Sequence, residues 1–269
     1  YPFIQSIQSI LPIVDEFIVN VGKSEDDTLK MIKSISDKKI KIIQSQWNDT
    51  ISDRGYVYGQ QKMIAQFNCT GDWAFYIEGD EVYHEADLKQ ILKSMKMYLN
   101  DPNVEALVFD FKHFYGNPNS FLDSPGWYRS EARIIKNSVR TYAPDGLFWL
   151  VLESNKKGRY PKSKKTGVTC YHYGWVRSEA QMNLKSSKVQ KYWGGEPVKI
   201  DYTKMDQSII KRFKGTHPKI VEDWLPNEIG LFEADKNYKP TQKQKKHRIM
   251  IGFENIFGVD LSKKHFKLV

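Results

Sequence analysis

The sequence predicts an α/β protein with a mixed, mostly parallel sheet flanked by helices. Helix-like and strand-like segments alternate over the first 85 residues, which is the pattern that builds a parallel sheet covered on both faces. The strand-like segments are short apolar or β-branched runs, as expected of strands buried on both faces. Apolar residues make up 40% of the chain and aromatic residues 13%, so the chain is globular.

The elements follow one another from the N-terminus. Apolar residues spaced i, i+3, i+4 and i+7 predict a helix over residues 3–11, which ends near a proline. A β-branched run predicts a strand over residues 16–21, and a second amphipathic helix is expected around residues 29–35. Another strand over residues 40–43 and a helix over residues 56–67 complete the alternation.

The stretch GDWAFYIEGDEVYHE, residues 71–85, is central to this arrangement. Its apolar and aromatic part predicts a buried strand, and three carboxylates follow directly, on Glu78, Asp80 and Glu81. Carboxylates on a short turn suit Mg²⁺ or Mn²⁺, which proteins hold with one or two carboxylates together with substrate phosphates. The alternative is a solvated acidic turn in which Glu81 favours the start of the next helix.

Two polar turns are expected at the same edge of the sheet, one after Val21 and one after Ile77. Ligands of open α/β sheets bind beyond the carboxyl ends of the strands. The convergence of the two turns therefore predicts a site for phosphate and metal. A sheet of this kind would begin with a strand ahead of the first helix, so we expect that the chain as given lacks its first strand.

Charge and cysteine content restrict the cellular setting. The net charge is +9, and residues 236–269 carry nine Lys or Arg against two acidic residues, so the main body is close to neutral. This basic end suits anionic lipid, nucleic acid or simply solvent. The sequence contains no apolar run of 18 residues, no signal-peptide pattern and only two cysteines, which together predict a cytoplasmic protein.

Several blocks of sequence resemble family-2 glycosyltransferases of the GT-A type. DEFIVNVGKSEDDT resembles the second strand and acidic loop of that family, and QQKMIAQFNCTGDWAFYIEGDEV resembles its helix, turn and strand ending in a DxD element. GDWAFYIEGDEVYHEADL, WYRSEARIIKN and YHYGWVRSEAQMNLK resemble a bacterial subgroup of these enzymes. The resemblance covers roughly residues 2–185.

The resemblance implies a GT-A fold with a catalytic domain over residues 1–175 and a helical, basic extension over residues 176–269 on the acceptor side. It implies inverting transfer of a sugar from a UDP- or GDP-type donor to a glycan or lipid-linked acceptor, as in polysaccharide biosynthesis. Mn²⁺ or Mg²⁺ would be the cofactor. The expected location is the cytoplasm, at the inner face of the membrane if the basic C-terminus contacts lipid, and no nucleic-acid partner is expected.

The same resemblance implies a set of metal ligands. Asp80 matches the second acidic position of DxD and would hold the divalent ion against the diphosphate. Glu78 matches the first position, where Asp is commoner. Glu81 matches the next acid, with a role toward ribose, metal or only the backbone. His172 is placed where some GT-A enzymes supply a late histidine to the metal, and its alternative role is structural.

Donor binding is implied for a second group of residues. Gly22 and Ser24 match the loop that wraps the base and ribose. Asn20 stands where many relatives have Asp, and its amide can still donate and accept hydrogen bonds. Lys62 stands where many relatives have an arginine that contacts the diphosphate, and the alternative is an exposed helical lysine.

An inverting transferase also needs a carboxylate that removes the proton of the acceptor hydroxyl. Glu131, in the block WYRSEARIIKN, is the first candidate, and Asp145 in the loop APDG is the competitor. The alternative for either carboxylate is a plain salt bridge to a nearby arginine.

Three other functions stay open at this stage. A nucleotidylyltransferase would share the sheet and the carboxylates, but the Gly- and Arg-rich loop expected after its first strand is not found. A catalytically inactive glycan-binding relative would fit Glu78 and Asn20. A nucleic-acid-binding module is suggested by the basic C-terminus and opposed by the near-neutral body.

Overall fold

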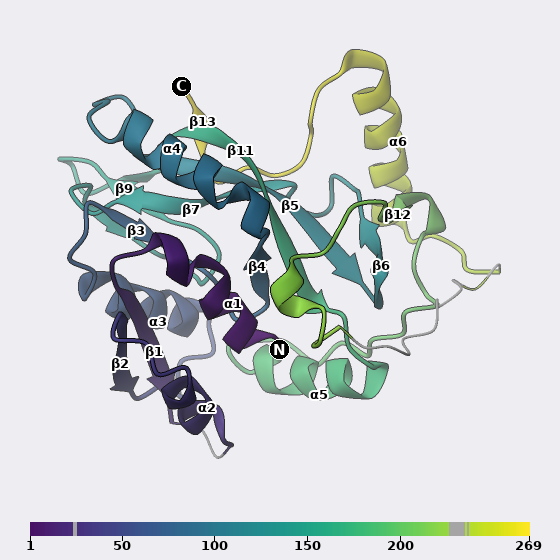
Figure 1. Ribbon diagram of the computed structural model, residues 1–269. Helices are drawn as coiled ribbons and strands as arrows, with labels where there is room; N and C mark the ends of the chain where they lie inside the picture. Colours follow the sequence, from purple (N-terminus) through teal and green to yellow (C-terminus); the bar gives the residue numbers. More distant parts are fainter. Residues whose placement is uncertain (24–25, 226–234, 236) are drawn as a thin grey trace.

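The computed structural model describes residues 1–23, 26–225, 235 and 237–269. Its helices are α1 (Phe3–Ile10), α2 (Thr28–Ser34), α3 (Tyr56–Phe67), α4 (Leu88–Tyr98), α5 (Glu179–Gln190) and α6 (Gln242–Phe257), as Figure 1 shows. Short 3₁₀ helices are η1 (Leu11–Ile13), η2 (Glu85–Asp87), η3 (Gln207–Ile209) and η4 (Lys219–Val221). The first part of the chain alternates between helices and strands, as the sequence predicts.

Within the described residues, the strands form three sheets. The first is a parallel pair, β1 (Phe17–Gly22) and β2 (Ile40–Ser45). The largest has eight strands, β3 (Trp73–Phe75), β4 (Glu81–Tyr83), β5 (Ala106–Tyr115), β6 (Asn117–Leu122), β7 (Ser130–Lys136), β11 (Lys162–Trp175), β12 (Ile210–Arg212) and β13 (Lys267–Leu268). A small antiparallel sheet contains β8 (Thr141–Tyr142), β9 (Leu150–Leu152) and β10 (Gly158–Arg159).

The large sheet is mixed. Its order along the main path is β12-β6-β5-β11-β13, with β4 on β11 and with β7 joining β5 to β3. The long pair β5–β11 is parallel, as is β11–β13, whereas β3, β4, β6, β7 and β12 pair antiparallel to their neighbours. An α/β protein with a large mixed sheet flanked by helices is therefore confirmed.

The two faces of the sheet bury separate apolar cores. One core joins Leu107 and Phe109 of β5 to Ile10 of α1 and Ile91 of α4. The other joins the alternate residues of β5 and β7 to Met63 of α3. Because successive side chains of a strand point to opposite faces, α1 and α4 cover one face and α3 covers the other.

The C-terminal part of the chain extends the same sheet. It supplies β12 to β6 and β13 to β11, and Figure 1 shows α6 projecting from the side of the molecule opposite β1 and β2. A capping box of Thr241 and Gln244 starts α6, and Gly258, with φ of 64°, ends it in the left-handed region that favours glycine. Among the described residues, no helix is both long enough and apolar enough to cross a bilayer.

Candidate functional site

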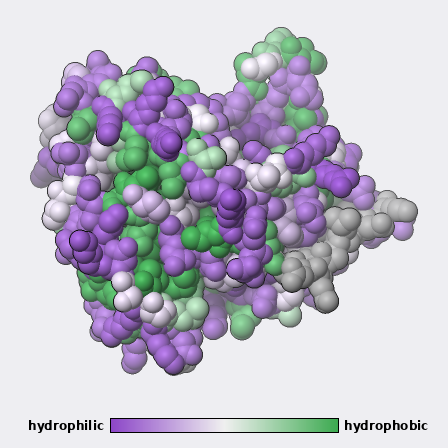
Figure 2. All heavy atoms as spheres, in the orientation of Figure 1, coloured by the Kyte–Doolittle hydropathy of each residue, from purple (hydrophilic) through white to green (hydrophobic). Residues whose placement is uncertain are grey.

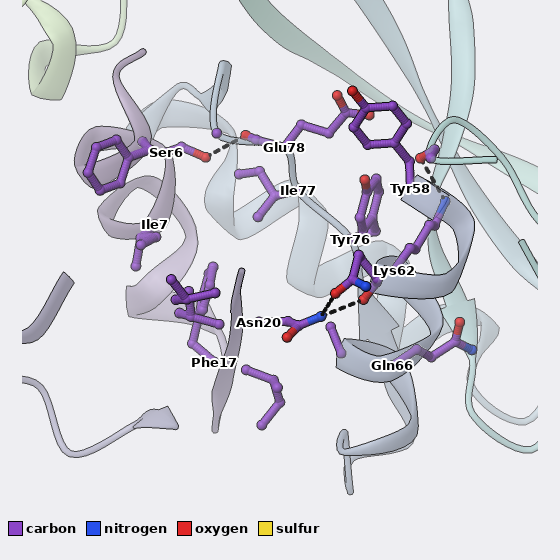
Figure 3. Close-up of a pocket in the computed structure, with 18 of the residues that line it drawn as sticks. Ser6, Ile7, Phe17, Asn20, Tyr58, Lys62, Gln66, Tyr76, Ile77 and Glu78 are labelled. Atoms are coloured by element: carbon purple, nitrogen blue, oxygen red, sulfur yellow. Dashed lines mark hydrogen bonds between the residues drawn. The ribbon is translucent and has the colours of Figure 1, made fainter. Parts of the chain in front are cut away.

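A cavity of about 1890 Å³ opens where β1 and β3 end. Its walls come from α1, β1, α3, and the strand and turn formed by residues 73–80, with α5 contributing at the mouth. Figure 3 shows Ile7, Phe17, Asn20, Lys62 and Ile77 around this open space. Segments far apart in the sequence thus meet in one cavity.

Asp80 lies in the turn between β3 and β4 and is 7% exposed. Within the described part of the chain, its buried Oδ1 atom has no hydrogen-bond partner. A Cβ atom on Gly174 would lie 2.8 Å from Oδ2, so this position needs glycine for the Asp80 carboxylate to fit. A buried carboxylate oxygen without a partner is costly unless a cation joins it.

His172 of β11 lies beside Asp80, with its Nε2 atom 3.6 Å from Oδ1. The protonation of His172 follows from its neighbour His113. His113 Nε2 lies 2.7 Å from the Tyr128 carbonyl oxygen, which can only accept, so Nε2 carries the hydrogen. Burial lowers the pKa of both histidines, so both are neutral and His113 Nδ1 is an acceptor.

His172 Nδ1 lies 3.1 Å from His113 Nδ1 and must therefore donate to it. This leaves a lone pair on His172 Nε2, the atom that faces Asp80. Two electron-pair donors, the carboxylate oxygen and the imidazole nitrogen, thus face each other with no proton assigned between them. A divalent cation fits this pair, because both are ordinary ligands of Mn²⁺ and related metals.

The described residues hold no group of three or more His, Cys, Asp or Glu side chains arranged to bind a metal ion. Asp80 and His172 alone make an incomplete ligand set. Such a set suits a metal that arrives with a diphosphate, since Mg²⁺ commonly keeps one or two carboxylates and takes its remaining ligands from phosphates and water.

Glu81 does not line the cavity. Its carboxylate is fully buried and forms a bidentate salt bridge with Arg133 of β7, with Nη2 2.6 Å from Oε1 and Nε 3.0 Å from Oε2. It also accepts a hydrogen bond of 3.3 Å from the Glu78 backbone N–H. Through these contacts the Glu81 carboxylate supports the turn, which explains why an acidic residue stands at this position. The same contacts leave Glu81 no access to ribose or metal.

Glu78 lines the cavity, and its side chain is 36% exposed. Burial on its protein side and the negative charge of Glu81 raise its pKa. Its backbone carbonyl accepts a hydrogen bond of 2.7 Å from Ser6 Oγ, which fixes the turn against α1. Its Oε1 atom lies 3.8 Å from Arg133 Nη2, so the Glu78 carboxylate is beside the buried Glu81–Arg133 pair.

Lys62 is 3% exposed, so it is not the exposed helical lysine of the alternative interpretation. Its Nζ atom lies 3.7 Å from the Trp149 ring centroid and 4.0 Å from that of Tyr76, and its carbonyl contact, Gly146 O, is 3.4 Å away. Burial, followed by the charge of Arg133, lowers its pKa to about 7. Because its surroundings stabilise the charged form of Lys62 only weakly, this side chain is suited to bind an incoming anion.

Asn20 and Gly22 of β1 line the same cavity. Asn20 Nδ2 donates to Gln61 O and Gln61 Oε1, each at 3.0 Å, and its buried Oδ1 atom has no partner among the residues described. A Cβ on Gly22 would lie 2.5 Å from Trp47 Nε1, so glycine allows the indole to pack there. Ser24 lies outside the described residues.

Sequence reasoning missed an aromatic group at the mouth of the cavity. It consists of Trp47, Tyr58, Tyr192 and Trp193. The ring centroid of Tyr58 lies 5.3 Å from that of Trp47 and 5.5 Å from that of Tyr192. Such rings can stack on a nucleobase. The sequence signal for this group was weak, because its aromatic residues come from three separate segments.

Lys185 of α5 was also missed by the sequence analysis, and its Nζ atom lies 3.8 Å from Asp80 Oδ2.

The two candidate bases differ in position. Glu131 is fully buried outside the cavity, where Oε2 lies 2.6 Å from His265 Nδ1 and Oε1 accepts from the Ala132 N–H. This carboxylate is satisfied by protein groups and has no path to an acceptor. Asp145 is half-buried and accepts from the Leu147 N–H, and its neighbours Gly146 and Leu147 line the cavity.

No protein-family model matches this sequence, and no curated protein matches it. The likeness to family-2 glycosyltransferases therefore depends on the sequence blocks alone.

Proposed function

We propose that this protein is a metal-dependent, inverting glycosyltransferase that uses a nucleotide-diphosphate sugar. One observation supports this most: a single cavity is lined by Asn20, Gly22 and Lys62, which the resemblance assigns to the donor, and by Glu78 and Asp80, which it assigns to the metal. A nucleotidylyltransferase and an inactive glycan-binding relative remain the alternatives.

The residues of this chain have distinct roles in the proposed reaction. Asn20 Oδ1 would accept from the base or ribose, and the aromatic group at the mouth would stack on the base. Lys62 would contact the diphosphate. Asp80 and His172 would hold Mn²⁺ or Mg²⁺, which when bound would offset the charge that develops on the leaving nucleoside diphosphate. Asp145 is the better placed of the two candidate bases for the acceptor hydroxyl.

The test is a thermal-shift screen of UDP- and GDP-sugars with and without Mn²⁺. The proposal expects stabilisation by one donor class that requires the metal, followed by sugar transfer with inversion. Pyrophosphate release from a nucleoside triphosphate and a sugar phosphate would favour the nucleotidylyltransferase. Metal-dependent binding without turnover, over a broad panel of acceptors, would favour the inactive relative.

The lowered pKa of Lys62 predicts a pH dependence of donor binding. Lysine binds the diphosphate best when protonated, so the affinity for UDP or GDP without metal should be highest at pH 6. It should weaken as the pH rises through about 7, by at most about tenfold for each pH unit. Calorimetry from pH 6 to 9 measures this, and Lys62→Arg, whose guanidinium stays charged, should flatten the profile. A profile that Lys62→Arg leaves unchanged would contradict this role.

The tautomer of His172 predicts an effect of a residue that touches no substrate. His113→Phe removes the acceptor for His172 Nδ1, so the imidazole is free to place its hydrogen on Nε2 or to turn. The affinity for Mn²⁺ in the presence of the nucleotide should fall about 10- to 100-fold. His113→Asn, whose amide can still accept, should restore part of that affinity. Equal loss in both variants, with equal loss of stability, would indicate only a packing role.

A membrane contact is proposed for α6. Its docked face includes Arg248, paired with Asp206 at 2.7 Å, and Glu254, paired with Arg129 at 2.6 Å. The outward face carries exposed apolar side chains, with Ile249 71%, Phe253 54%, Ile256 75% and Phe257 60% exposed. Figure 2 shows hydrophobic atoms at the top of this projection. Lysines 243, 245 and 246 begin the helix, and apolar plus basic residues together suit an anionic lipid surface.

Replacing Ile249, Phe253 and Ile256 with serine should reduce binding to vesicles of phosphatidylcholine with 30% phosphatidylserine at least about tenfold, because each buried apolar side chain contributes about 1.5–3 kcal/mol. Sedimentation with vesicles measures this. The control is Phe67→Ser, which removes an exposed aromatic ring (75%) on α3. Equal binding by the triple variant and wild type would dismiss the contact.

A further inference from the structure

Among the described residues, Lys185 of α5 is the one lysine or arginine within ion-pair distance of the Asp80 carboxylate. Its Nζ atom lies 3.8 Å from Asp80 Oδ2, and its side chain is 28% exposed. This separation is too long for a hydrogen bond, so the two groups interact through their charges. The other carboxylate oxygen, Oδ1, faces His172 Nε2 at 3.6 Å. Lys185 and His172 thus approach different oxygens of the same carboxylate.

The helix that carries Lys185 is held by contacts on an adjacent face. Met182 is 3% exposed and belongs to an apolar core. Asn183 Oδ1 accepts a hydrogen bond of 2.7 Å from the Ile200 N–H, and Ser186 Oγ donates to Val198 O at 2.9 Å. Because these contacts lie on both sides of Lys185 in the sequence, the backbone at this position is fixed and the side chain stays within reach of Asp80.

A second side of α5 faces the cavity. Lys185, Lys188 and Val189 line it, and their spacing of three and four residues places them on one side of the helix. Figure 1 shows α5 next to the start of α1, and Lys185 Nζ lies 4.8 Å from the ring centroid of Tyr1. Lys188 is exposed. Of the two lysines on this side, Lys185 is the one that reaches the candidate metal ligand.

The charge of Lys185 opposes a bare metal ion on Asp80. A divalent cation at Oδ1 and the ammonium at Oδ2 would share one carboxylate, so like charges would lie only a few ångströms apart. Asp80 is 7% exposed, and a partly buried site screens such repulsion less than bulk water does. A metal that arrives as a diphosphate complex brings negative charge, which the same ammonium attracts.

Neighbouring charges do not replace this effect. The guanidinium of Arg133 is fully buried and is already bound by both oxygens of Glu81. Lys62 lies between the rings of Tyr76 and Trp149, and no ion pair joins it to Asp80 within the described part of the chain. Lys62 is therefore placed to attract an anion, whereas Lys185 is placed both to attract an anion and to repel a metal.

We propose that Lys185 is a specificity-determining residue, which makes the Asp80 site bind a divalent metal weakly by itself and tightly as the complex of that metal with a diphosphate. The inference rests on the proposed function for the identity of the anion. Its two electrostatic effects, however, are measurable with Mn²⁺ and inorganic pyrophosphate alone. No proton transfer or bond change is assigned to Lys185.

The test compares wild type with Lys185→Met, which removes the charge and keeps the length of the stem. Electron paramagnetic resonance of free Mn²⁺ measures metal binding, and calorimetry measures pyrophosphate binding in the presence of Mn²⁺. The variant should bind Mn²⁺ alone at least about tenfold more tightly and pyrophosphate with Mn²⁺ at least about tenfold more weakly. Lys185→Arg keeps the charge and should resemble wild type in both measurements.

Lys188→Met is the matched control, because it removes the same charge from the same cavity-facing side of α5. It should change the affinity for Mn²⁺ alone by less than about twofold, since charge interactions weaken with distance and with exposure to solvent. Adding Asp80→Asn to Lys185→Met should abolish the gain in Mn²⁺ affinity. The melting temperature of Lys185→Met should stay close to that of wild type, because partly exposed ion pairs contribute little to stability.

The opposite signs of the two effects separate this role from a structural ion pair. Unchanged Mn²⁺ affinity in Lys185→Met, absence of Mn²⁺ binding to that variant, or parallel loss of both affinities would overturn the proposal. A gain in Mn²⁺ affinity that survives Asp80→Asn would also overturn it. If the predicted pattern holds and no nucleotide sugar binds, the glycosyltransferase proposal fails while the role of Lys185 stands. Metal-dependent binding of a nucleotide sugar, with Mn²⁺ affinity unchanged in Lys185→Met, would overturn the role of Lys185 alone.

Discussion

Asp80→Asn is expected to abolish metal-dependent donor binding and to lower the rate of sugar transfer about 1000-fold. The estimate follows from the several kcal/mol that a bound metal contributes to charge stabilisation, with each 1.36 kcal/mol worth a factor of ten. The substitution keeps the shape of the side chain and removes one ligand charge. Titration of Mn²⁺ with UDP- or GDP-sugar, followed by transfer assays, measures both effects.

The stability of Asp80→Asn separates a ligand role from a structural one. Asp80 Oδ1 is buried with no hydrogen-bond partner among the residues described, so neutralising it should leave the melting temperature without metal unchanged or slightly higher. The matched control is Asp110→Asn, which alters a surface ion pair with Lys165 at 2.8 Å. Retained metal-dependent binding in Asp80→Asn, or a large loss of stability, would count against the site.

Glu81→Gln should reduce the free energy of unfolding by about 3–5 kcal/mol, because it leaves the Arg133 guanidinium buried with an incomplete partner. Both side chains are fully buried, and Arg133 Nη1 also donates to Leu147 O at 3.0 Å. A melting temperature lower by roughly 10 °C is expected for a chain of this size. Thermal and urea unfolding measure the effect.

The double variant Glu81→Met with Arg133→Met distinguishes support of the turn from contact with a ligand. Removing both charges from a buried pair is often nearly neutral, so stability should return close to that of the wild type. Metal-dependent donor binding should return with it, if Glu81 acts only through the fold. A double variant that is stable yet unable to bind the donor would give Glu81 a direct role and contradict the structural assignment.

Local elements were predictable because their signals are short in range. The apolar spacing of residues 3–11 and the run of residues 56–67 predicted α1 and α3 closely. The buried strand before Asp80 was visible in its aromatic run, although β3 ends at Phe75 because the chain turns toward β4. The candidate donor residues on these elements line one cavity for the same reason: strands that run in parallel deliver their ends to one edge.

The rest of the site depends on contacts that no local pattern reveals. The partner of Glu81 is Arg133, and that of Glu131 is His265, 134 residues further along the chain. Each pair forms only once the strands are assembled, so the sequence could not separate a buried salt bridge from a ligand or a base. The role of His113 in orienting His172 has the same origin, since β5 and β11 become neighbours only in the sheet.

The most direct test of the account is a crystal structure with Mn²⁺ and a nucleoside diphosphate, with anomalous scattering to locate the metal. The account predicts one strong anomalous peak within about 2.6 Å of Asp80 Oδ1, touching both the diphosphate and His172 Nε2, with the base near Asn20. A diphosphate bound in the cavity with the metal elsewhere, or a nucleotide bound away from Asp80, would contradict it.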